Sequence, residues 1–203
     1  KFRFNKKKIF ELMLWINNKQ SRKKYVSRKV CSLYFDNKSL QMYLDSVEGV
    51  TPRKKIRLRI YNETNFLKDN INVNIEKKIS SVEGRFKVTK KITDVNKFLN
   101  YGVYDNSYGN CYPRIIVSYN RSYYQFENYR MTIDENICYE KFNKLSGRSK
   151  LVYDDLNVFE IKYNERDENI ANLQNDFPFE KSRFSKYCRA VDLTSLENKV
   201  SNL

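Results

Sequence analysis

The sequence contains no histidine, and only five glycines and three prolines occur among its 203 residues. The absence of histidine excludes a Ser-His-Asp triad, a Cys-His pair, a zinc site with histidine ligands and general-base catalysis by imidazole. The scarcity of glycine and proline argues against disorder, low-complexity sequence and a glycine-rich nucleotide loop. Any catalysis must therefore use carboxylates, lysine, arginine, tyrosine or a metal ion held by oxygen.

Cysteine pairs and long apolar runs are also missing. The four cysteines are far apart in the sequence and form no CxxC pair, which argues against a zinc site and against a disulfide scaffold. No apolar run reaches the roughly 18 residues that a membrane-spanning helix needs, and no signal peptide is visible. We therefore expect reduced thiols and a cytoplasmic location. A membrane-bound partner, anchor or regulatory domain outside this chain is left open.

A net charge of +15 is the main feature that is present. A field of that size attracts polyanions, and nucleic acid, an anionic membrane surface and phosphate compounds all fit it. The length suits a single domain with one sizeable core, so we expect one domain over residues 1–203.

The stretch RKKIRLRIY, residues 53–61, predicts a strand in which every second side chain is a cation. Side chains two apart on a strand point to the same face, so these cations repel each other unless an anion lies among them. One face carries Arg53, Lys55, Arg57 and Arg59, and the other carries Ile56, Leu58 and Ile60.

Similar alternation occurs in other predicted strands. Residues 72–79 place Glu76 and Lys78 on one face, and residues 158–163 do the same for Glu160 and Lys162. Ordinary half-exposed sheets also alternate, with the polar face in water. Repeated cations with sparse glutamate favour instead a barrel that is apolar outside, covered by helices, and charged inside. Because unpaired buried cations are costly, such an interior requires an anion.

The pattern as a whole predicts an α+β fold, an antiparallel β-barrel of roughly eight strands with peripheral helices. Besides 53–61, strands are predicted at 1–4, 30–35, 72–79, 114–125, 129–134 and 158–163. Helices are predicted after an Asn5 cap to about residue 18 and at 94–99, 169–176 and 180–190, with a short helix or turn at 39–44. In LYFDN (33–37) we expect core residues followed by a turn that Asp36 caps.

Seven motifs occur in one order and cover residues 1 to about 190. They are LYFDN, RKKIRLRIY, IEKK (75–78), SYNRSYY (118–124), YRMTID (129–134), VFEIKY (158–163) and RFSKYC (183–188). This series resembles the VTC domain, the polyphosphate polymerase domain of the vacuolar transporter chaperone complex, within the CYTH-like triphosphate tunnel metalloenzymes. The resemblance implies an eight-stranded barrel that holds triphosphate with basic residues and a divalent metal with carboxylates.

The resemblance also implies a reaction, in which the γ-phosphate of ATP is transferred to a growing inorganic polyphosphate chain. Phosphoryl transfer depends on positioning and charge neutralisation, which suits a site without histidine. Triphosphate and pyrophosphate are further expected ligands. The implied metal is Mn²⁺ or Mg²⁺, since oxygen ligands suit both.

The resemblance assigns roles to individual residues by motif. Arg57 and Arg59 match the RxR pair that grips the triphosphate, and Glu160 matches the metal-binding carboxylate. Glu76 is a second metal ligand or a partner of Lys78. Together with the arginine pair, Lys78 and Lys162 are the expected catalytic cations. The complete set of matched phosphate ligands is Lys1, Arg57, Arg59, Lys78, Arg121, Arg130, Lys162, Arg183 and Lys186.

Some positions stay open on the sequence alone. Arg53 and Lys55 lie near the start of their strand, where a tunnel rim and a solvated position are equally compatible. The family often places a lysine after the strand that contains IEKK, and here either Arg85 or Lys87 fits that position.

Three alternative functions remain. Triphosphatases of the same fold typically carry paired glutamates in the first strand. This sequence begins at Lys1, so that element is either missing or was cut away. A non-catalytic binder or accessory protein would keep the arginine pair without turnover. The charge and the 15% aromatic content also suit a nucleic-acid binder. The sequence lacks the RNP, KH-type and zinc signatures of nucleic-acid binders, so nucleic acid is not an expected partner.

Overall fold

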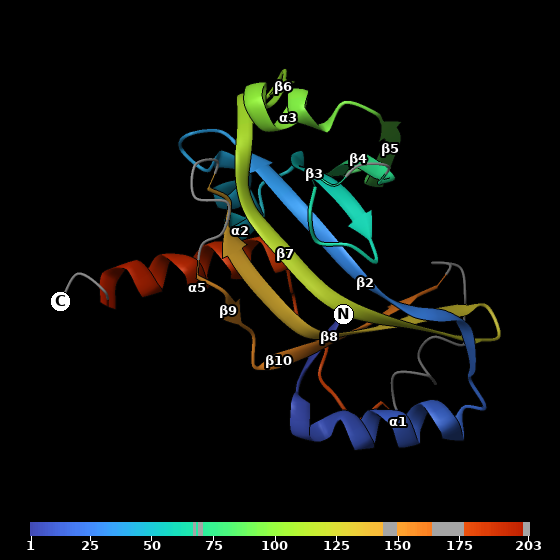
Figure 1. Cartoon of the computed structure of the whole chain (residues 1–203). Coiled ribbons are helices and arrows are strands. Elements are labelled where there is room, and N and C mark those ends of the chain that lie inside the picture. The colour runs from blue at the N-terminus through green and yellow to red at the C-terminus, as the bar shows by residue number, and fades with distance from the viewer. Residues whose placement is uncertain (67, 69–70, 144–149, 164–176, 201–203) are drawn as a thin grey trace. The chain divides into compact units, whose positions relative to one another are not determined.

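The structure, a computed structural model, describes residues 1–66, 68, 71–143, 150–163 and 177–200, with the backbone alone for 196–200 (Figure 1). In this described part, ten strands form one sheet, in which β6 (Val103–Asp105) pairs with β7 and β9 (Val152–Tyr153) pairs with β8. The other eight follow the order β1 (Phe2–Asn5), β10 (Leu156–Lys162), β8 (Tyr129–Lys141), β7 (Gly109–Phe126), β2 (Arg22–Asp36), β3 (Arg53–Tyr61), β4 (Val73–Ser81) and β5 (Gly84–Ile92).

This arrangement confirms the predicted α+β class with an antiparallel sheet. The order of paired strands begins at β1 and ends at β5, and the described strands do not strictly close it. The chain divides into two compact units. Unit 1 comprises Lys1–Lys29, Tyr119–Ile137 and Tyr153–Phe184, and unit 2 comprises Val30–Ser118, Cys138–Val152 and Ser185–Leu203.

Unit 1 is built around an aromatic core. In β1 the burial alternates, because Phe2 and Phe4 point inward while their neighbours are exposed. β1 pairs antiparallel with β10, which in turn pairs antiparallel with β8. The helix α1 (Ile9–Asn18) packs on this sheet face through Leu12, Trp15 and Ile16. Burying these large side chains together is the main source of the unit's stability.

The start of α1 follows the sequence prediction. The Asn5 side chain accepts a hydrogen bond from the Lys7 backbone N–H at 3.0 Å, and thus caps the short 3-10 turn Lys6–Lys8 that leads into α1. On the inward side of α1, Leu12 and Ile16 are fully buried. Trp15 joins the same core.

Unit 2 contains the continuous meander β3, β4 and β5 beside the second part of β2. Its helices are α2 (Gln41–Glu48), α3 (Val95–Tyr101) and α5 (Lys186–Val200). Asp36 accepts hydrogen bonds from the Met42 and Tyr43 backbone N–H groups at the start of α2. The expected cap is therefore confirmed. Asp36 also accepts one from the Tyr187 hydroxyl at 2.6 Å, which ties α5 to this turn.

The element predictions were most accurate where a cap or a strict alternation marked the boundary. Strand 53–61 coincides with β3, and Asp94 caps α3 through the Lys97 N–H. The predicted helix at 180–190 is wrong in its first part, because α5 begins at Lys186. There Lys181 forms an isolated bridge to Phe2, and Phe179 stacks on Phe4. The predicted helix at 169–176 lies outside the described residues.

Candidate functional site

The charged face of unit 2 spans three neighbouring strands. Residues directly opposite one another share a face, and the register places Lys55 opposite Lys78 and Lys78 opposite Lys87. We call this surface the basic face. It carries one carboxylate, Glu76, and eight cations: Arg53, Lys55, Arg57, Arg59, Lys78, Arg85, Lys87 and Lys91.

Arg57 and Glu76 form the centre of the basic face. The Arg57 Nε donates to Glu76 Oε2 at 2.7 Å, and its Nη2 donates to the same oxygen. Its Nη1 donates to the Tyr34 hydroxyl at 2.9 Å. Arg57 and Glu76 are 6% and 2% exposed, so the pair is almost completely removed from water. A buried arginine in this setting needs its partners, because an unpaired buried charge is very costly.

Two further cations approach the Glu76 carboxylate. The Arg59 Nη1 lies 3.6 Å from Oε2, and the Lys87 Nζ lies 2.5 Å from Oε1. Burial of Glu76 by itself raises the carboxyl pKa, but the positive charges of Arg57 and Arg59 and the hydrogen bonds from Lys87 and Arg57 lower it to about 2. Glu76 is therefore an ionised carboxylate held among three cations.

Tyr34 also belongs to this site, although it was not among the predicted site residues. Its ring stacks on Tyr187 at a centroid distance of 5.1 Å, and the Arg57 guanidinium lies 5.7 Å from the ring centroid. Burial raises the phenol pKa, yet the charges of Arg57, Arg59 and Lys55 and the hydrogen bond from Arg57 lower it to about 8. In sequence, Tyr34 stands in VCSLYF, where it is indistinguishable from a core aromatic residue.

The two positions left open near the start of β3 make contacts within unit 2. Arg53 donates from Nη1 to the backbone carbonyls of Gly49 and Val50, at the end of α2. Lys55 donates to the Ser185 hydroxyl at 2.7 Å, just before α5. Lys186, a predicted phosphate ligand, is the first residue of α5 and is half-buried.

The choice between Arg85 and Lys87 depends on the β4–β5 hairpin. Its turn is Val82 and Glu83, because Ser81 pairs with Gly84. This register places both Arg85 and Lys87 on the basic face, and it is Lys87 that contacts Glu76.

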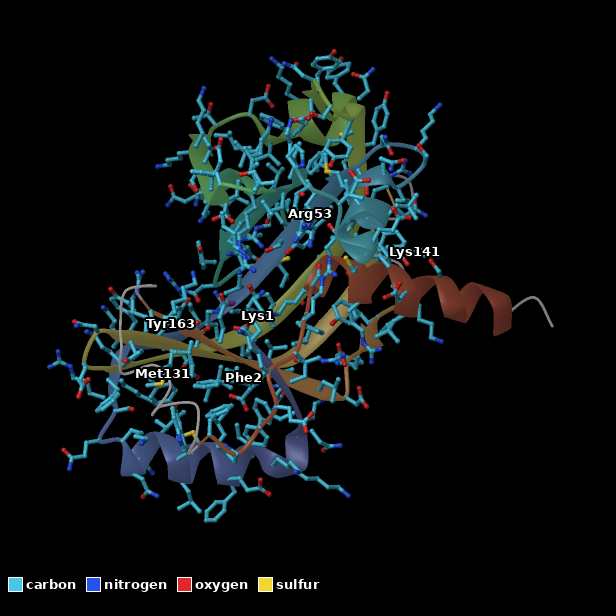
Figure 2. The ribbon with its side chains drawn as sticks, turned by 180° about the vertical axis from the view of Figure 1, so that it is seen from behind. Lys1, Phe2, Arg53, Met131, Lys141 and Tyr163 are labelled. Atoms are coloured by element: carbon cyan, nitrogen blue, oxygen red, sulfur yellow. The ribbon has the colours of Figure 1, made fainter. Side chains whose placement is uncertain are left out.

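The predicted site residues of unit 1 form a second group. On β10, Glu160 lies opposite Thr132, and Lys162 lies opposite Arg130. The Lys1 Nζ is 3.9 Å from Glu160 Oε2, with the two side chains 37% and 23% exposed. Figure 2 labels Lys1 and its neighbour Phe2 at the start of the chain. The structure thus brings together Lys1 and Glu160, and it aligns the exposed cations Lys162 and Arg130 across two strands.

Arg121, another predicted phosphate ligand in unit 1, forms a two-pronged ion pair with Asp134. The Arg121 Nε and Nη2 lie 2.5 and 2.7 Å from the two carboxylate oxygens, and Asp134 is 1% exposed. Such a fork-to-fork pair fixes the guanidinium plane. Arg183, the remaining predicted ligand, is exposed.

The carboxylates differ in how well they suit a metal ion. Within the described residues, no three acidic or cysteine side chains gather at one point. Mg²⁺ and Mn²⁺ often use one or two protein carboxylates together with substrate phosphates and water. Glu160, which is partly exposed, fits that mode. Both Glu76 oxygens already accept from cations, so its role as a metal ligand stays a prediction.

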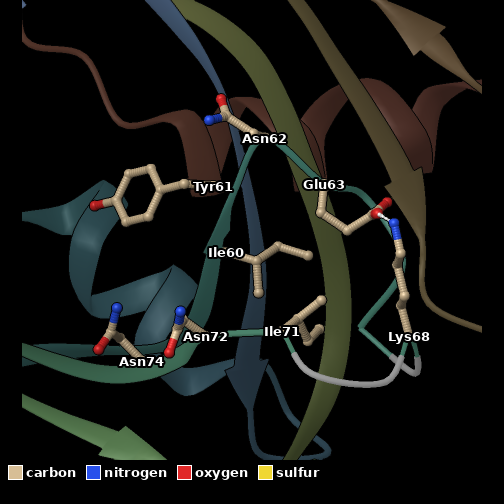
Figure 3. Close-up of a pocket in the computed structure, with 8 residues that line it drawn as sticks. All are labelled: Ile60, Tyr61, Asn62, Glu63, Lys68, Ile71, Asn72 and Asn74. Carbon is tan, nitrogen blue, oxygen red and sulfur yellow. Dashed lines mark hydrogen bonds and ion pairs between the residues drawn. The ribbon is translucent and has the colours of Figure 1, made fainter.

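Figure 3 shows a pocket of about 440 Å³ in unit 2, where β3 ends and β4 begins. Glu63 and Lys68 form an ion pair of 2.7 Å on one side of it. Asn74, on another side, lies opposite Arg59 on the basic face. The lining residues are Ile60, Tyr61, Asn62, Glu63, Lys68, Ile71, Asn72 and Asn74.

Comparison with known proteins gives one extensive match. The family model described as the VTC domain matches residues 3–108 and 103–195. No curated protein matches the chain. Among solved structures, a candidate adenylate cyclase from Vibrio parahaemolyticus shares 10% identity at a TM-score of 0.47, covering 96% of this chain and 84% of that one. The PH1012 protein from Pyrococcus horikoshii shares 13% identity at 0.47, covering 86% and 84%.

Proposed function

Because this chain belongs to the VTC domain family, we propose that it is a polyphosphate polymerase that uses ATP as phosphate donor. A terminal oxygen of the growing polyphosphate chain attacks the γ-phosphorus of ATP. The bond from that phosphorus to the β–γ bridging oxygen breaks, ADP leaves, and the acceptor chain is longer by one phosphoanhydride bond.

The observation that carries this proposal is the basic face of unit 2. Eight cations share three neighbouring strands with a single carboxylate, Glu76, so the face has a large surplus of positive charge. A triphosphate or polyphosphate chain supplies several negative charges along an extended backbone, which is the complement that such a face requires.

The residues have distinct parts in the proposed reaction. Arg57 and Arg59 hold and orient non-bridging phosphate oxygens through planar guanidinium groups, while Lys78 acts as a point charge beside them. Neutralising the charge that spreads over the transferred group lowers the barrier for phosphoryl transfer. In unit 1, Lys1, Arg121, Arg130, Lys162 and Arg183 are the proposed further phosphate contacts, and Lys186 has that role in unit 2.

Glu160 is the proposed ligand of a divalent metal, with Mn²⁺ or Mg²⁺ as the candidates. Such an ion, when bound, would neutralise charge on the phosphate oxygens. The Lys1 Nζ lies 3.9 Å from the same carboxylate, so a bound metal would compete with this contact.

A triphosphatase is the second candidate, because the cations of the basic face would hold a triphosphate whichever nucleophile attacks it. If water replaced the polyphosphate terminus as nucleophile, the same cations would serve hydrolysis. A binder without turnover would need only the cations.

The products separate these functions. The protein is incubated with ATP and Mn²⁺ or Mg²⁺, and the mixture is resolved on a polyphosphate gel. Long chains with ADP support the polymerase, whereas inorganic phosphate alone supports hydrolysis and no product supports a binder. Lys97→Ala, an exposed position on α3, and Glu83→Gln, in the β4–β5 turn, serve as controls for Arg57→Ala and Glu160→Gln.

A further inference from the structure

The segment from Lys6 to Lys29 in unit 1 concentrates positive charge. It contains nine lysines and arginines but only one acidic residue, Glu11. Lys6, Lys7 and Lys8 are all exposed, and so are Arg22, Lys23 and Lys24 at the start of β2. None of these residues belongs to the site proposed above, so their charge needs a separate explanation.

The outward side of α1 adds large apolar side chains to this charge. Phe10 is 68% exposed and Leu14 is 47% exposed, although both are of the type that helices usually bury. They are four residues apart and therefore share one face of the helix. Lys7 precedes Phe10 by three residues and extends the same face. Figure 2 shows side chains of α1 pointing both toward the strands and away from them.

We propose that this α1 outer face, made of Lys6, Lys7, Phe10 and Leu14, docks the protein on an anionic lipid bilayer. Lys8 lies beside this face, with its Nζ 5.9 Å from the centroid of the Phe179 ring, and adds to its charge. A bilayer with acidic headgroups offers negative charge at its surface and an apolar layer immediately below. Lysines interact with the headgroups, and Phe10 and Leu14 insert at the boundary with the acyl chains. The inference is independent of the proposed polymerase activity.

The apolar pair decides between a membrane and a nucleic acid. Duplex DNA or RNA would use the lysines but offers an exposed leucine no apolar layer to enter. Within the described residues, no helix is long and apolar enough to cross a bilayer, so the proposal concerns attachment at the surface. Trp15 and Leu12 on the inward side hold α1 in the core of unit 1, which presents the outer face without unfolding the helix.

The test is co-sedimentation of the full chain with vesicles of phosphatidylcholine, with and without phosphatidylglycerol. We expect binding to the anionic vesicles alone, and weaker binding as salt increases. The double variant Phe10→Ser with Leu14→Ser should lower vesicle affinity by about tenfold or more, as should replacement of Lys6, Lys7 and Lys8 by glutamine. The melting temperature verifies that each variant folds.

Two controls keep the test specific. Val82→Ser alters an apolar side chain that is 92% exposed in unit 2, and the triple change Lys38→Gln, Lys90→Gln and Lys97→Gln removes the same charge from exposed positions elsewhere. Both should bind vesicles like the unchanged protein. The proposal is overturned if the protein does not bind anionic vesicles, or if the control variants bind them as weakly as the α1 variants do. It is also overturned if the protein binds a DNA duplex more tightly than vesicles and this binding is unaffected by loss of Phe10 and Leu14.

Discussion

Arg57 and Glu76, on neighbouring strands, are paired so closely that two guanidinium nitrogens donate to one carboxylate oxygen. The third nitrogen, Nη1, donates to the Tyr34 hydroxyl. A phosphate that binds Arg57 therefore either shares the guanidinium group with Glu76 or displaces Glu76 from it. Glu76 thus acts as an internal anion among the cations of the basic face.

Replacing Glu76 by glutamine should lower the stability of the ligand-free protein and increase the stabilisation that tripolyphosphate gives. Loss of the charge leaves Arg57, Arg59 and Lys87 without their shared anion, which should lower the free energy of unfolding by about 3 kcal/mol. Tripolyphosphate can then supply the missing charge. We expect a lower melting temperature without ligand and a larger rise on adding tripolyphosphate than in the unchanged protein.

Glu83→Gln is the matched control, because Glu83 lies in the turn of the same hairpin but not on the basic face. It should change neither the melting temperature nor its rise. If tripolyphosphate raises the melting temperature of Glu76→Gln only as much as that of the unchanged protein, then Glu76 and tripolyphosphate do not compete for the same cations.

The acid stability of the protein should depend on Glu76. Its pKa is lowered from 4.5 to about 2 in the folded state. A depressed pKa contributes stability above the unfolded value, and that contribution is lost as pH falls through the folded value. The difference in unfolding free energy between the unchanged protein and Glu76→Gln should therefore shrink between about pH 5 and pH 2. A difference that stays constant over this range contradicts the lowered pKa.

Tyr34 should ionise at a lower pH than an ordinary tyrosine. With a pKa of about 8 in place of 10, its phenolate absorbance should develop near pH 8 in a difference spectrum between the unchanged protein and Tyr34→Phe. By the same linkage, the stability that Tyr34 contributes should grow between pH 8 and pH 10. Adding Arg57→Ala removes both the positive charge and the hydrogen bond, so the transition should move back toward pH 10.

The Arg121–Asp134 pair should behave as a coupled unit in unfolding experiments. Asp134→Asn leaves a partly buried guanidinium without its carboxylate and should cost about 3 kcal/mol or more. A double-mutant cycle with Arg121→Gln should give a coupling energy well above that of an exposed pair. Glu63 and Lys68, whose lysine is 61% exposed, provide that comparison. Equal coupling in the two pairs would mean that burial gives the Arg121–Asp134 pair no additional strength.

The sequence predicted the basic face correctly where the two-residue period alone is sufficient. Arg57 and Arg59 share a face in any regular strand, and the structure places both on the basic face with Glu76 between neighbouring cations. The caps at Asn5 and Asp36 were also predicted, because a short polar side chain can accept hydrogen bonds from the backbone N–H groups at the start of a helix.

Other features depended on long-range packing. The strand β5 was not predicted, because only Phe86 and Val88 alternate with cations before the polar run of residues 89–91 ends the pattern. The same hairpin register decides that Lys87 contacts Glu76. Tyr34 was missed since its role arises from Arg57 and Tyr187, which come from β3 and α5.

The proposed polymerase activity is tested most directly by following the polyphosphate acceptor and not the consumption of ATP. A polyphosphate primer labelled at one end is incubated with the protein, ATP and Mn²⁺, and its length is followed on a gel. We predict stepwise lengthening that stops in the double variant Arg57→Ala with Arg59→Ala and continues in Lys97→Ala. A primer that keeps its length or becomes shorter while ATP is consumed would contradict the assignment of this chain as a polyphosphate polymerase.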